Sequence, residues 1–390
     1  MKILLIKAMA EAHAYSQFAN ALEAALRELG HEPVISDQGG NVRDGVASNH
    51  QLVAELQVGR YDAVLSFSSF FGSIRLQDGR SLFDALGVRF AGWQLDHPIY
   101  TPQSLTPTLQ SRFAVYSNPN HLRYAEAVRL PGRGMSLLPG GELPTTPPAD
   151  HRNRSHGVLI AAVYRGEPAR LWEQLADSPG KRLLTGVVDH LLADPGASLL
   201  DAFNATAAQL QLGVQLGQDP AFDSEMMKFL REPLTYVRNL DRLRIVSALV
   251  DAGLPVTICG AGWRDRFGDR PNLAYLPPVD FKDLPALYGD ARIVINLNAG
   301  NGASERAVHA SLAGAAVLSD FSPLLEELFR GGDGLAFFDR AKPLTVAEVA
   351  AELLEGGRTD ELARRGFERV AGAGLWRHRA AQLVRFLGQP

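Results

Sequence analysis

Short apolar runs alternate with segments of helical periodicity along most of the chain. Residues 3–6 form the first run, a helix is expected over about 15–29, and a second apolar run lies around 33–35. Further short runs follow at 61–70, 88–96 and 112–118. This order is typical of a parallel sheet covered by helices on both faces. We therefore predict an α/β fold that begins with a Rossmann-like, doubly wound domain.

The periodic pattern breaks at residues 138–156, where proline, glycine and polar residues resemble a connection between domains. A second series of apolar runs follows, at 157–164, 254–260, 272–276, 291–297, 315–320 and 334–339. A mostly helical segment at about 167–252 separates its first two runs and is longer than one crossover helix requires. We predict two doubly wound domains, 1–150 and 151–375, with a helical elaboration in the second, and a C-terminal helix at 376–390.

Composition narrows the class of protein. The chain has 390 residues, 46% of them hydrophobic, and a formal net charge of −4. A chain of this length is expected to form two cores. The sequence has no basic run interleaved with aromatic residues, so we do not expect a nucleic-acid partner. The single cysteine, Cys259, allows neither an internal disulfide nor a cysteine-rich zinc site, so we expect no metal and a reducing compartment.

Hydropathy does not suggest a membrane protein. The apolar run at 3–6 is too short for a signal-peptide core, and no segment reaches the length of a membrane span. We therefore expect a cytoplasmic protein without a transmembrane segment.

A loop of small residues after the run at 291–297 leads into a short helix. Ser304 is expected to cap this helix and Gly314 to end it. The free amides of its first turn would face the carboxyl edge of the sheet, where they favour an anion such as a diphosphate. Gly300 and Gly302 would let a ligand approach the backbone closely. The segment is a candidate phosphate site.

Other positions are expected at the same edge of the sheet. Arg165 lies just past the run at 157–164, where its guanidinium could bind phosphate with two hydrogen bonds. The remaining candidates are Gly260 and Gly262 in a turn after a strand, and Asn298, Glu305, Arg306 and His309 around the short helix. A helix start with solvated polar residues is the alternative interpretation. The order of these segments favours a binding site.

The same order resembles the donor-binding domain of GT-B glycosyltransferases, especially the branch similar to the spore maturation protein CgeB. The segments concerned are "CGAGW" from Cys259, "YLPPVDFKDLPALYGDARIVINLN" from Tyr275, "ERAVHASLAGAAVLSDFSPLLEELF" from Glu305 and "GDGLAFF" from Gly332. The resemblance covers about 158–339 apart from the helical elaboration, and extends more faintly to the first domain. It implies two Rossmann-like domains facing across a cleft, a nucleotide-sugar donor on the second, an acceptor mainly on the first, and no essential metal.

The resemblance also implies roles for single residues. Related enzymes commonly carry a Glu where this chain has His309, and a second acidic residue eight positions earlier, where it has Asn301. Arg306 matches an arginine of the CgeB-like pattern. Tyr275 and Leu276 begin the loop that usually cradles the base through backbone groups. The two departures keep open a catalytically silent nucleotide-sugar-binding or coat-associated protein.

Three residues of the first domain are candidate catalytic groups. His13 lies in the loop after the first strand, which borders the acceptor in GT-B enzymes, and imidazole titrates near neutrality. Asp96 and His97 follow the run at 88–96, in a segment similar to the Trp/Asp/Pro segment of CgeB-like chains. A surface histidine and an ordinary Asx or proline turn are the alternatives. We expect one of the three to position or deprotonate the acceptor.

The resulting hypothesis is a bacterial, metal-independent hexosyltransferase that moves a sugar from a nucleoside diphosphate to an acceptor hydroxyl or polymer. Arg165, Arg306 and the helix amides would offset charge on the leaving diphosphate. The resemblance leans toward retention of configuration, whereas a base at His13 would suit inversion. A nucleotide-sugar epimerase or hydrolase is a rival on the same fold. A nicotinamide dehydrogenase is disfavoured because no G-x-G-x-x-G follows the first strand.

Overall fold

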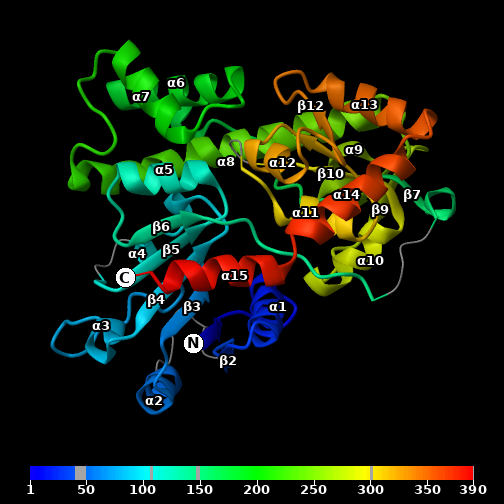
Figure 1. Ribbon diagram of the computed structural model, residues 1–390. Helices are drawn as coiled ribbons and strands as arrows, with labels where there is room; N and C mark the ends of the chain where they lie inside the picture. The colour runs from blue at the N-terminus through cyan, green and yellow to red at the C-terminus, as the bar shows by residue number, and fades with distance from the viewer. Residues whose placement is uncertain (40–49, 106–108, 146–149, 299–301, 390) are drawn as a thin grey trace. The chain divides into compact units, whose positions relative to one another are not determined.

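The computed structural model describes residues 1–39, 50–105, 109–145, 150–298 and 302–389 (Figure 1). The chain divides into two compact units, the first formed by Met1–Gly140 with Leu375–Pro390 and the second by Gly141–Gly374. Each contains a six-stranded sheet in which every strand pairing is parallel. The predicted α/β class is therefore confirmed.

The sheet of the first unit has the order β2-β1-β3-β4-β5-β6. Its strands are β1 Lys2–Lys7, β2 Glu32–Asp37, β3 Ala63–Phe67, β4 Arg89–Gln94, β5 Arg112–Tyr116 and β6 Arg133–Ser136. The winding reverses between β1 and β3, so the loops that follow these two strands diverge at the carboxyl edge. The edge strand β6 was not predicted, because its sequence RGMS has a single strongly apolar side chain.

The helices of the first unit are α1 Ala14–Glu28, α2 His50–Gly59, α3 Leu82–Leu86, α4 Pro102–Leu105, α5 Pro119–Ala127 and α15 Trp376–Leu387, with the 3-10 turn η2 Pro98–Tyr100. The C-terminal helix, α15, is part of this unit. The Trp376 ring lies 5.4 Å from the Phe18 ring of α1 and 5.8 Å from the Trp93 ring of β4. Burial of these large rings explains why the last helix packs with the first unit.

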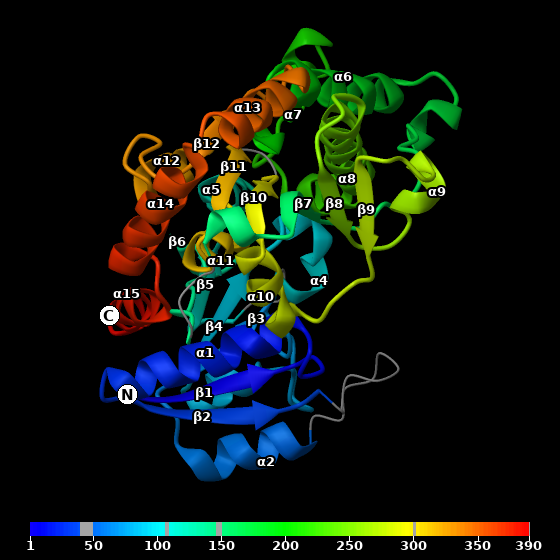
Figure 2. The same ribbon diagram turned by 90° about the vertical axis from the view of Figure 1, so that its right-hand side faces the viewer.

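The sheet of the second unit has the order β12-β11-β10-β7-β8-β9 (Figure 2). Its strands are β7 His156–Ala161, β8 Val256–Cys259, β9 Leu273–Leu276, β10 Ala291–Asn296, β11 Ala316–Asp320 and β12 Ala336–Phe338. The winding starts at the central strand β7 and reverses between β7 and β10. In open α/β sheets, ligands bind at such a reversal, outside the carboxyl ends of the strands.

Helices cover both faces of this second sheet. The helices of the second unit are α6 Pro179–Ala193, α7 Leu199–Gln209, α8 Pro220–Asp251, α9 Trp263–Phe267, α10 Leu284–Gly289, α11 Glu305–Leu312, α12 Pro323–Leu328, α13 Leu344–Glu355 and α14 Thr359–Ala373, with the 3-10 turns η3 His151–Asn153, η4 Leu171–Gln174 and η5 Phe281–Asp283. Within the described residues, no helix is both long and apolar enough to cross a bilayer.

The predicted helical elaboration at about 167–252 is formed mainly by α6, α7 and α8. The last turns of α8 contribute Ile245, Val246 and Leu249 to the core, which also contains Val158 of β7 and Ile258 of β8. The carboxyl half of α8 is therefore the crossover helix between these strands. Helix α6 packs against both α7 and α8 (Figure 1).

Candidate functional site

The start of α11 agrees with the sequence-based expectation. The hydroxyl of Ser304 caps the helix and accepts a hydrogen bond from the Arg306 amide at 3.2 Å. Gly314 follows the helix with φ 77°, as a C-terminal glycine should. Gly302 is buried just before the cap, whereas Gly300 and Asn301 lie outside the described residues. The first turn of α11 therefore begins at the carboxyl edge of the sheet, after β10, the neighbour of β7.

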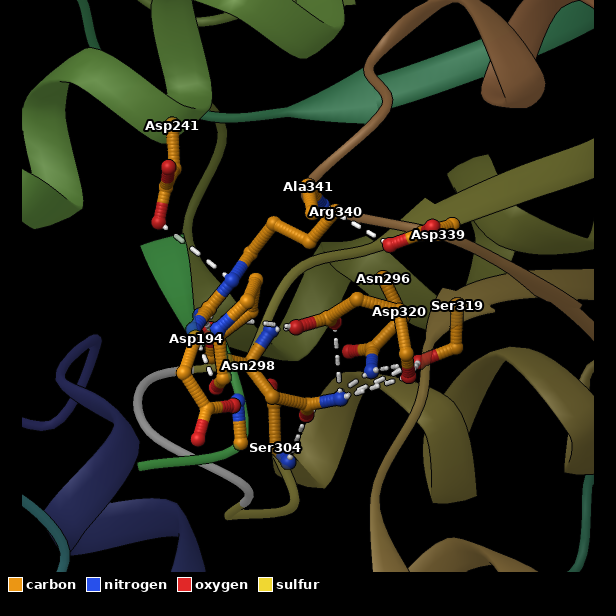
Figure 3. Close-up of polar contacts among 12 residues, drawn as sticks. Asp194, Asp241, Asn296, Asn298, Ser304, Ser319, Asp320, Asp339, Arg340 and Ala341 are labelled. Atoms are coloured by element: carbon orange, nitrogen blue, oxygen red, sulfur yellow. Dashed lines mark hydrogen bonds and ion pairs between the residues drawn. The ribbon is translucent and has the colours of Figure 1, made fainter. Parts of the chain in front are cut away.

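Asn298 supports this loop through a buried polar network (Figure 3). Its amide N–H donates to Asp320 Oδ1 at 2.8 Å, and its Nδ2 donates to Ser319 Oγ at 3.1 Å. Its Oδ1 accepts hydrogen bonds from the Ser304 amide at 2.9 Å and from Asn296 Nδ2 at 3.0 Å. Because these bonds join β10 and β11 to the helix cap, the side chain of Asn298 holds the loop.

Arg340, which follows β12, is a site residue that the sequence did not single out. Its Nη1 donates to the Asn298 carbonyl at 3.1 Å, and its Nη2 donates to the Pro195 carbonyl at 2.6 Å. Its Nε lies 3.4 Å from Asp241 Oδ2, and its Nη1 lies 3.7 Å from Asp320 Oδ2. The Arg340 side chain is only 8% exposed. An arginine after a short strand resembles any surface arginine in sequence, so no local signal marks it.

The two carboxyl groups beside Arg340 have raised pKa values. Burial raises the pKa of Asp320 to about 7, although the Arg340 charge and the hydrogen bond from the Asn298 amide both lower it. Burial also raises the pKa of Asp241, against the charges of Arg340 and Arg244. One guanidinium thus faces two carboxyl groups that are costly to ionise where they lie.

Four arginines gather at the carboxyl edge of the second sheet. Arg165 and Arg306 were predicted there, and α8 adds Arg238 and Arg242. Burial, with the positive charges of Arg238, Arg306 and Arg165, lowers the pKa of Arg242 to about 10. The Arg242 Nη1 donates to the Val163 carbonyl at 3.1 Å. Like charges held together raise each other's free energy, so this arginine cluster favours an anionic ligand.

Arg306 retains a hydrogen-bonding group for such a ligand. It bonds to the hydroxyl of Tyr288 on α10, whose pKa is raised by burial and lowered by the Arg306 charge. The Arg306 Nε is buried and has no hydrogen-bond partner among the described residues. The negative charge of Glu305, in the same first turn of α11, acts on Tyr288 in the opposite direction and raises its pKa. The first turn of α11 therefore offers both helix amides and a guanidinium.

His309 lies one turn after Glu305 on α11, as their spacing predicts. Its ring is partly exposed and makes an edge contact with the Phe281 ring, with centroids 5.4 Å apart. A side chain added at Gly141 would lie 3.7 Å from His309 Cδ2. Phe281 of η5 and the start of the second unit thus lie beside the imidazole.

The two glycines of the "CGAGW" turn serve backbone packing. Gly260 has φ 148°, and a Cβ there would lie 2.0 Å from the Ala162 carbonyl oxygen. Gly262 has φ 87°, and a Cβ there would lie 2.7 Å from the Tyr164 carbonyl oxygen. These contacts press the turn against residues 162–164, immediately before Arg165. The glycines thus shape the edge on which Arg165 lies, and their conformations need no ligand contact to explain them.

Gly260→Ala should lower the free energy of unfolding by about 2 kcal/mol, because the new methyl group would overlap a backbone oxygen and the φ angle disfavours it. Chemical denaturation measures the change. Gly166→Ala is the matched control: Gly166 also has a positive φ, of 90°, but an added Cβ there meets nothing within 4 Å. Equal losses in the two variants would mean that the close approach at Gly260 is unimportant.

Tyr275 and Leu276 begin the predicted base-recognition loop. The Tyr275 hydroxyl donates to the Gly268 carbonyl at 2.7 Å, and the Arg264 guanidinium lies over the ring at 5.1 Å from its centroid. The Tyr275 side chain is therefore engaged with α9 and the residues after it. The Leu276 carbonyl accepts from the Gly260 amide at 3.2 Å, and the Cys259 thiol donates to the Pro277 carbonyl at 3.3 Å. These bonds fix the start of the loop.

In the first unit, His13 is the N-cap of α1. Its Nδ1 accepts a hydrogen bond from the Tyr15 amide at 3.2 Å. Burial lowers the pKa of His13, so the ring is neutral at pH 7. A neutral ring that accepts at Nδ1 carries its proton on Nε2. In this arrangement His13 presents a hydrogen-bond donor, not the basic nitrogen that the prediction required.

Asp96 and His97 differ in burial after β4. The His97 side chain is buried, packs against the rings of His121 and Tyr124, and accepts a hydrogen bond from the Ile99 amide at 3.3 Å. Asp96 is exposed to solvent. His97 therefore caps the 3-10 turn η2, in line with the turn interpretation.

The loop after β3 carries backbone strain that the sequence analysis missed. Ser68, Ser69 and Phe71 have φ angles of 55°, 55° and 68°, which are unusual for residues other than glycine. Gly92 on β4 leaves space for Ser69, whose hydroxyl accepts from Gln94 Nε2. The loop lies at the winding reversal of the first sheet, and such strain concentrates at functional sites. It is the clearest candidate ligand-facing segment of the first unit.

Comparison with known proteins agrees with this geometry. Residues 238–385 match a protein family described as "Glycosyl transferase-like". This matched segment contains Arg238, Arg242, Arg306 and Arg340. No curated protein sequence matches the chain.

Solved structures resemble the chain over its whole length. A sucrose-phosphate synthase from Thermosynechococcus elongatus is 11% identical with a TM-score of 0.55, covering 99% of this chain and 98% of the other. An alpha-glucosyltransferase in complex with UDP and DNA is 11% identical with a TM-score of 0.54, covering 100% of both chains. The Anabaena protein HepE in complex with UDP-glucose is 10% identical with a TM-score of 0.54, covering 99% of this chain and 100% of the other. The chain thus has the fold of the GT-B glycosyltransferases and, from Arg238 onward, resembles a glycosyl transferase-like family.

Proposed function

We propose that this protein is a glycosyltransferase that binds a nucleoside diphosphate sugar on its second unit and transfers the sugar to an acceptor hydroxyl. The arginine cluster formed by Arg165, Arg238, Arg242 and Arg306 is the observation that carries the proposal. It lies at the winding reversal of the sheet, where α11 also begins, and these are the two features that phosphate binding uses in α/β folds.

The proposed chemistry is electrostatic. Cleavage of the bond between sugar and phosphate leaves negative charge on the departing diphosphate, and preorganised cations beside it lower the barrier. Arg306 would donate to the diphosphate from the first turn of α11, and Arg165 and Arg242 would add positive charge. The four guanidinium groups supply the neutralising charge that metal ions supply elsewhere, which is why we propose a metal-independent reaction.

The predicted catalytic side chains of the first unit favour transfer with retention of configuration. Inversion by direct displacement needs a general base for the acceptor hydroxyl. His13 and His97 both accept a backbone N–H at Nδ1, so neither offers a basic nitrogen without first breaking its cap. Asp96, which is exposed, is the remaining predicted residue for orienting an acceptor, which we place in the class of glycans, proteins or small hydroxylated molecules. The reduced Cys259 thiol suits a cytoplasmic location.

Nucleotide binding tests this function directly. UDP, GDP, CDP, dTDP and their sugar conjugates should be compared by thermal shift, beginning with UDP because two of the similar structures were solved with UDP or UDP-glucose. One nucleotide should raise the melting temperature of the wild type. Arg306→Ala should lose most of this shift, because it removes a direct phosphate donor.

Product analysis separates the rivals. Sugar transfer to an added acceptor supports the proposal, whereas rapid release of free sugar or of an epimer from the donor alone would favour a hydrolase or epimerase. Nucleotide binding without turnover across donors and acceptors would favour the silent binding protein. We include this last outcome because His309 stands where similar enzymes commonly carry a Glu. The absence of a shift with any nucleotide would overturn the proposal.

A further inference from the structure

Helix α8 carries groups of opposite charge within little more than one turn. Arg238 and Arg242 belong to the arginine cluster, and Asp241, directly before Arg242, pairs with Arg340. The Asp241 side chain is 13% exposed and that of Arg340 is 8% exposed. Removal of one partner from an ion pair at this depth is costly, because it leaves the other charge buried without compensation.

Arg340 connects four segments of the second unit (Figure 3). It binds the Pro195 carbonyl between α6 and α7, Asp241 of α8, Asp320 of β11 and the Asn298 carbonyl of the loop that leads to α11. The helical elaboration and the start of α11 are therefore fastened to one guanidinium. The groups that Arg340 binds all belong to the protein itself, which suits a supporting role.

The arginine cluster needs such a support. Without a bound anion, the charges of Arg238 and Arg242 on α8 repel that of Arg306 on α11 and favour separation of the two helices. The pair between Asp241 and Arg340 opposes this separation, because it holds α8 to the residue that also holds the loop before α11. A site kept assembled in this way does not have to pay an ordering cost when the ligand binds.

We propose that Arg340 is a positioning residue, whose ion pair with Asp241 keeps Arg238 and Arg242 of α8 beside Arg306 of α11 and so preassembles the diphosphate site. This inference rests on the proposed function. It adds to that function a pair of residues that set the affinity of the site without contacting the ligand.

Asp241→Asn distinguishes positioning from simple charge. Removing a negative charge from the helix that carries Arg238 and Arg242 should tighten the binding of an anion if only Coulomb attraction mattered. Loss of the ion pair between Asp241 and Arg340 should instead weaken UDP binding by roughly tenfold. Titration calorimetry measures the affinity. If the thermal-shift screen identifies another nucleotide, that nucleotide replaces UDP. Tighter or unchanged binding would overturn the proposal.

Arg340→Met and Arg340→Lys provide a second test. Methionine removes every bond of the guanidinium, whereas lysine keeps the charge for Asp241 but cannot reach all four partners. Nucleotide affinity should therefore fall most in the methionine variant and recover in part with lysine. Circular dichroism and unfolding curves establish whether each variant is folded. If Arg340→Met does not fold, Asp241→Asn alone tests the positioning role.

A double-mutant cycle shows whether Arg340 acts through the cluster. In an Arg242→Met background, Arg340→Met should cost much less affinity than it does in the wild type, because one of the groups it positions is already gone. Additive losses would contradict positioning. Asp333→Asn, which breaks an exposed ion-pair group with Arg365 and Arg369 in the same unit, is the control and should leave nucleotide affinity unchanged.

These results separate the two levels of the proposal. If the wild type binds no nucleotide, the proposed function fails. If the wild type binds a nucleotide and the Asp241 and Arg340 variants bind it equally well, the function stands and the positioning role fails.

Discussion

Arg242→Met should weaken nucleotide binding by roughly 10- to 100-fold while raising the stability of the ligand-free protein. The first effect is the loss of charge-assisted hydrogen bonds to the diphosphate. The second follows from the pKa of Arg242, which burial and the neighbouring positive charges lower to about 10 on folding. A cation with a lowered folded pKa destabilises the protein at every pH at which it is charged, and methionine removes this cost. After allowance for screening by solvent, the gain is on the order of 1 kcal/mol.

Two measurements and one control test this prediction. Urea unfolding without ligand gives the stability change, and calorimetric titration with the preferred nucleotide gives the affinity. Arg244→Met is the matched control, because Arg244 is an exposed arginine of the same helix that does not contribute to the lowered pKa of Arg242. Its affinity should match that of the wild type. An Arg242→Met variant that is less stable without ligand and binds normally would identify Arg242 as a structural residue only.

Asp320→Asn should make the protein more stable than the wild type at pH 8, with an advantage that shrinks as the pH falls toward 5. Burial raises the pKa of Asp320 from 3.8 to about 7 in the folded state. Between these values the unfolded chain ionises and the folded protein does not, so this carboxyl group costs increasing stability as the pH rises. The cost is fully present above about pH 7, with an upper limit of about 4 kcal/mol.

The groups that face Asp320 make asparagine a suitable replacement. Arg340 from the residues after β12 and Asp241 from α8 are its charged neighbours, and the Asn298 amide donates to its Oδ1. Asparagine keeps an oxygen for that hydrogen bond and never ionises. Melting temperatures of both proteins at several pH values between 5 and 8 measure the difference.

The surface residue Asp333 is a control, because its pKa is shifted in the direction opposite to that of Asp320. Hydrogen bonds from Arg369 and Arg365 lower the pKa of Asp333, so its ionised form stabilises the folded protein. Asp333→Asn should therefore show no gain over the wild type as the pH rises from 5 to 8. A stability difference between Asp320→Asn and the wild type that does not change with pH would show that Asp320 titrates normally.

Local interactions made much of the second unit predictable from the sequence. The apolar runs at 254–260, 291–297 and 315–320 coincide with β8, β10 and β11, because buried parallel strands are apolar on both faces. The cap at Ser304 was predictable because capping depends on a hydroxyl and amides within two residues. The same logic placed Arg306 and Arg165 at the carboxyl edge, since each directly follows a predicted strand or cap.

Side-chain surroundings limited the predictions for the first unit. His13, Asp96 and His97 were placed correctly in the segments that follow β1 and β4. The structure nevertheless gives two of them a cap, and which nitrogen of an imidazole remains free depends on a hydrogen bond that the sequence does not specify. The strained residue Ser69 likewise depends on space left by Gly92 on another strand.

The sequence by itself determined the α/β class, the strands of the second unit and the location of Arg165 and Arg306 at the carboxyl edge of its sheet. These features were predictable because periodicity and capping act over a few residues. Only the tertiary structure decided that Arg238 and Arg242 of α8 join them, and that Arg340 meets Asp241 about one hundred residues earlier in the chain. Those contacts depend on which face of a long helix packs against the sheet, and that face is chosen by apolar burial around Val246 and Leu249 across the whole core.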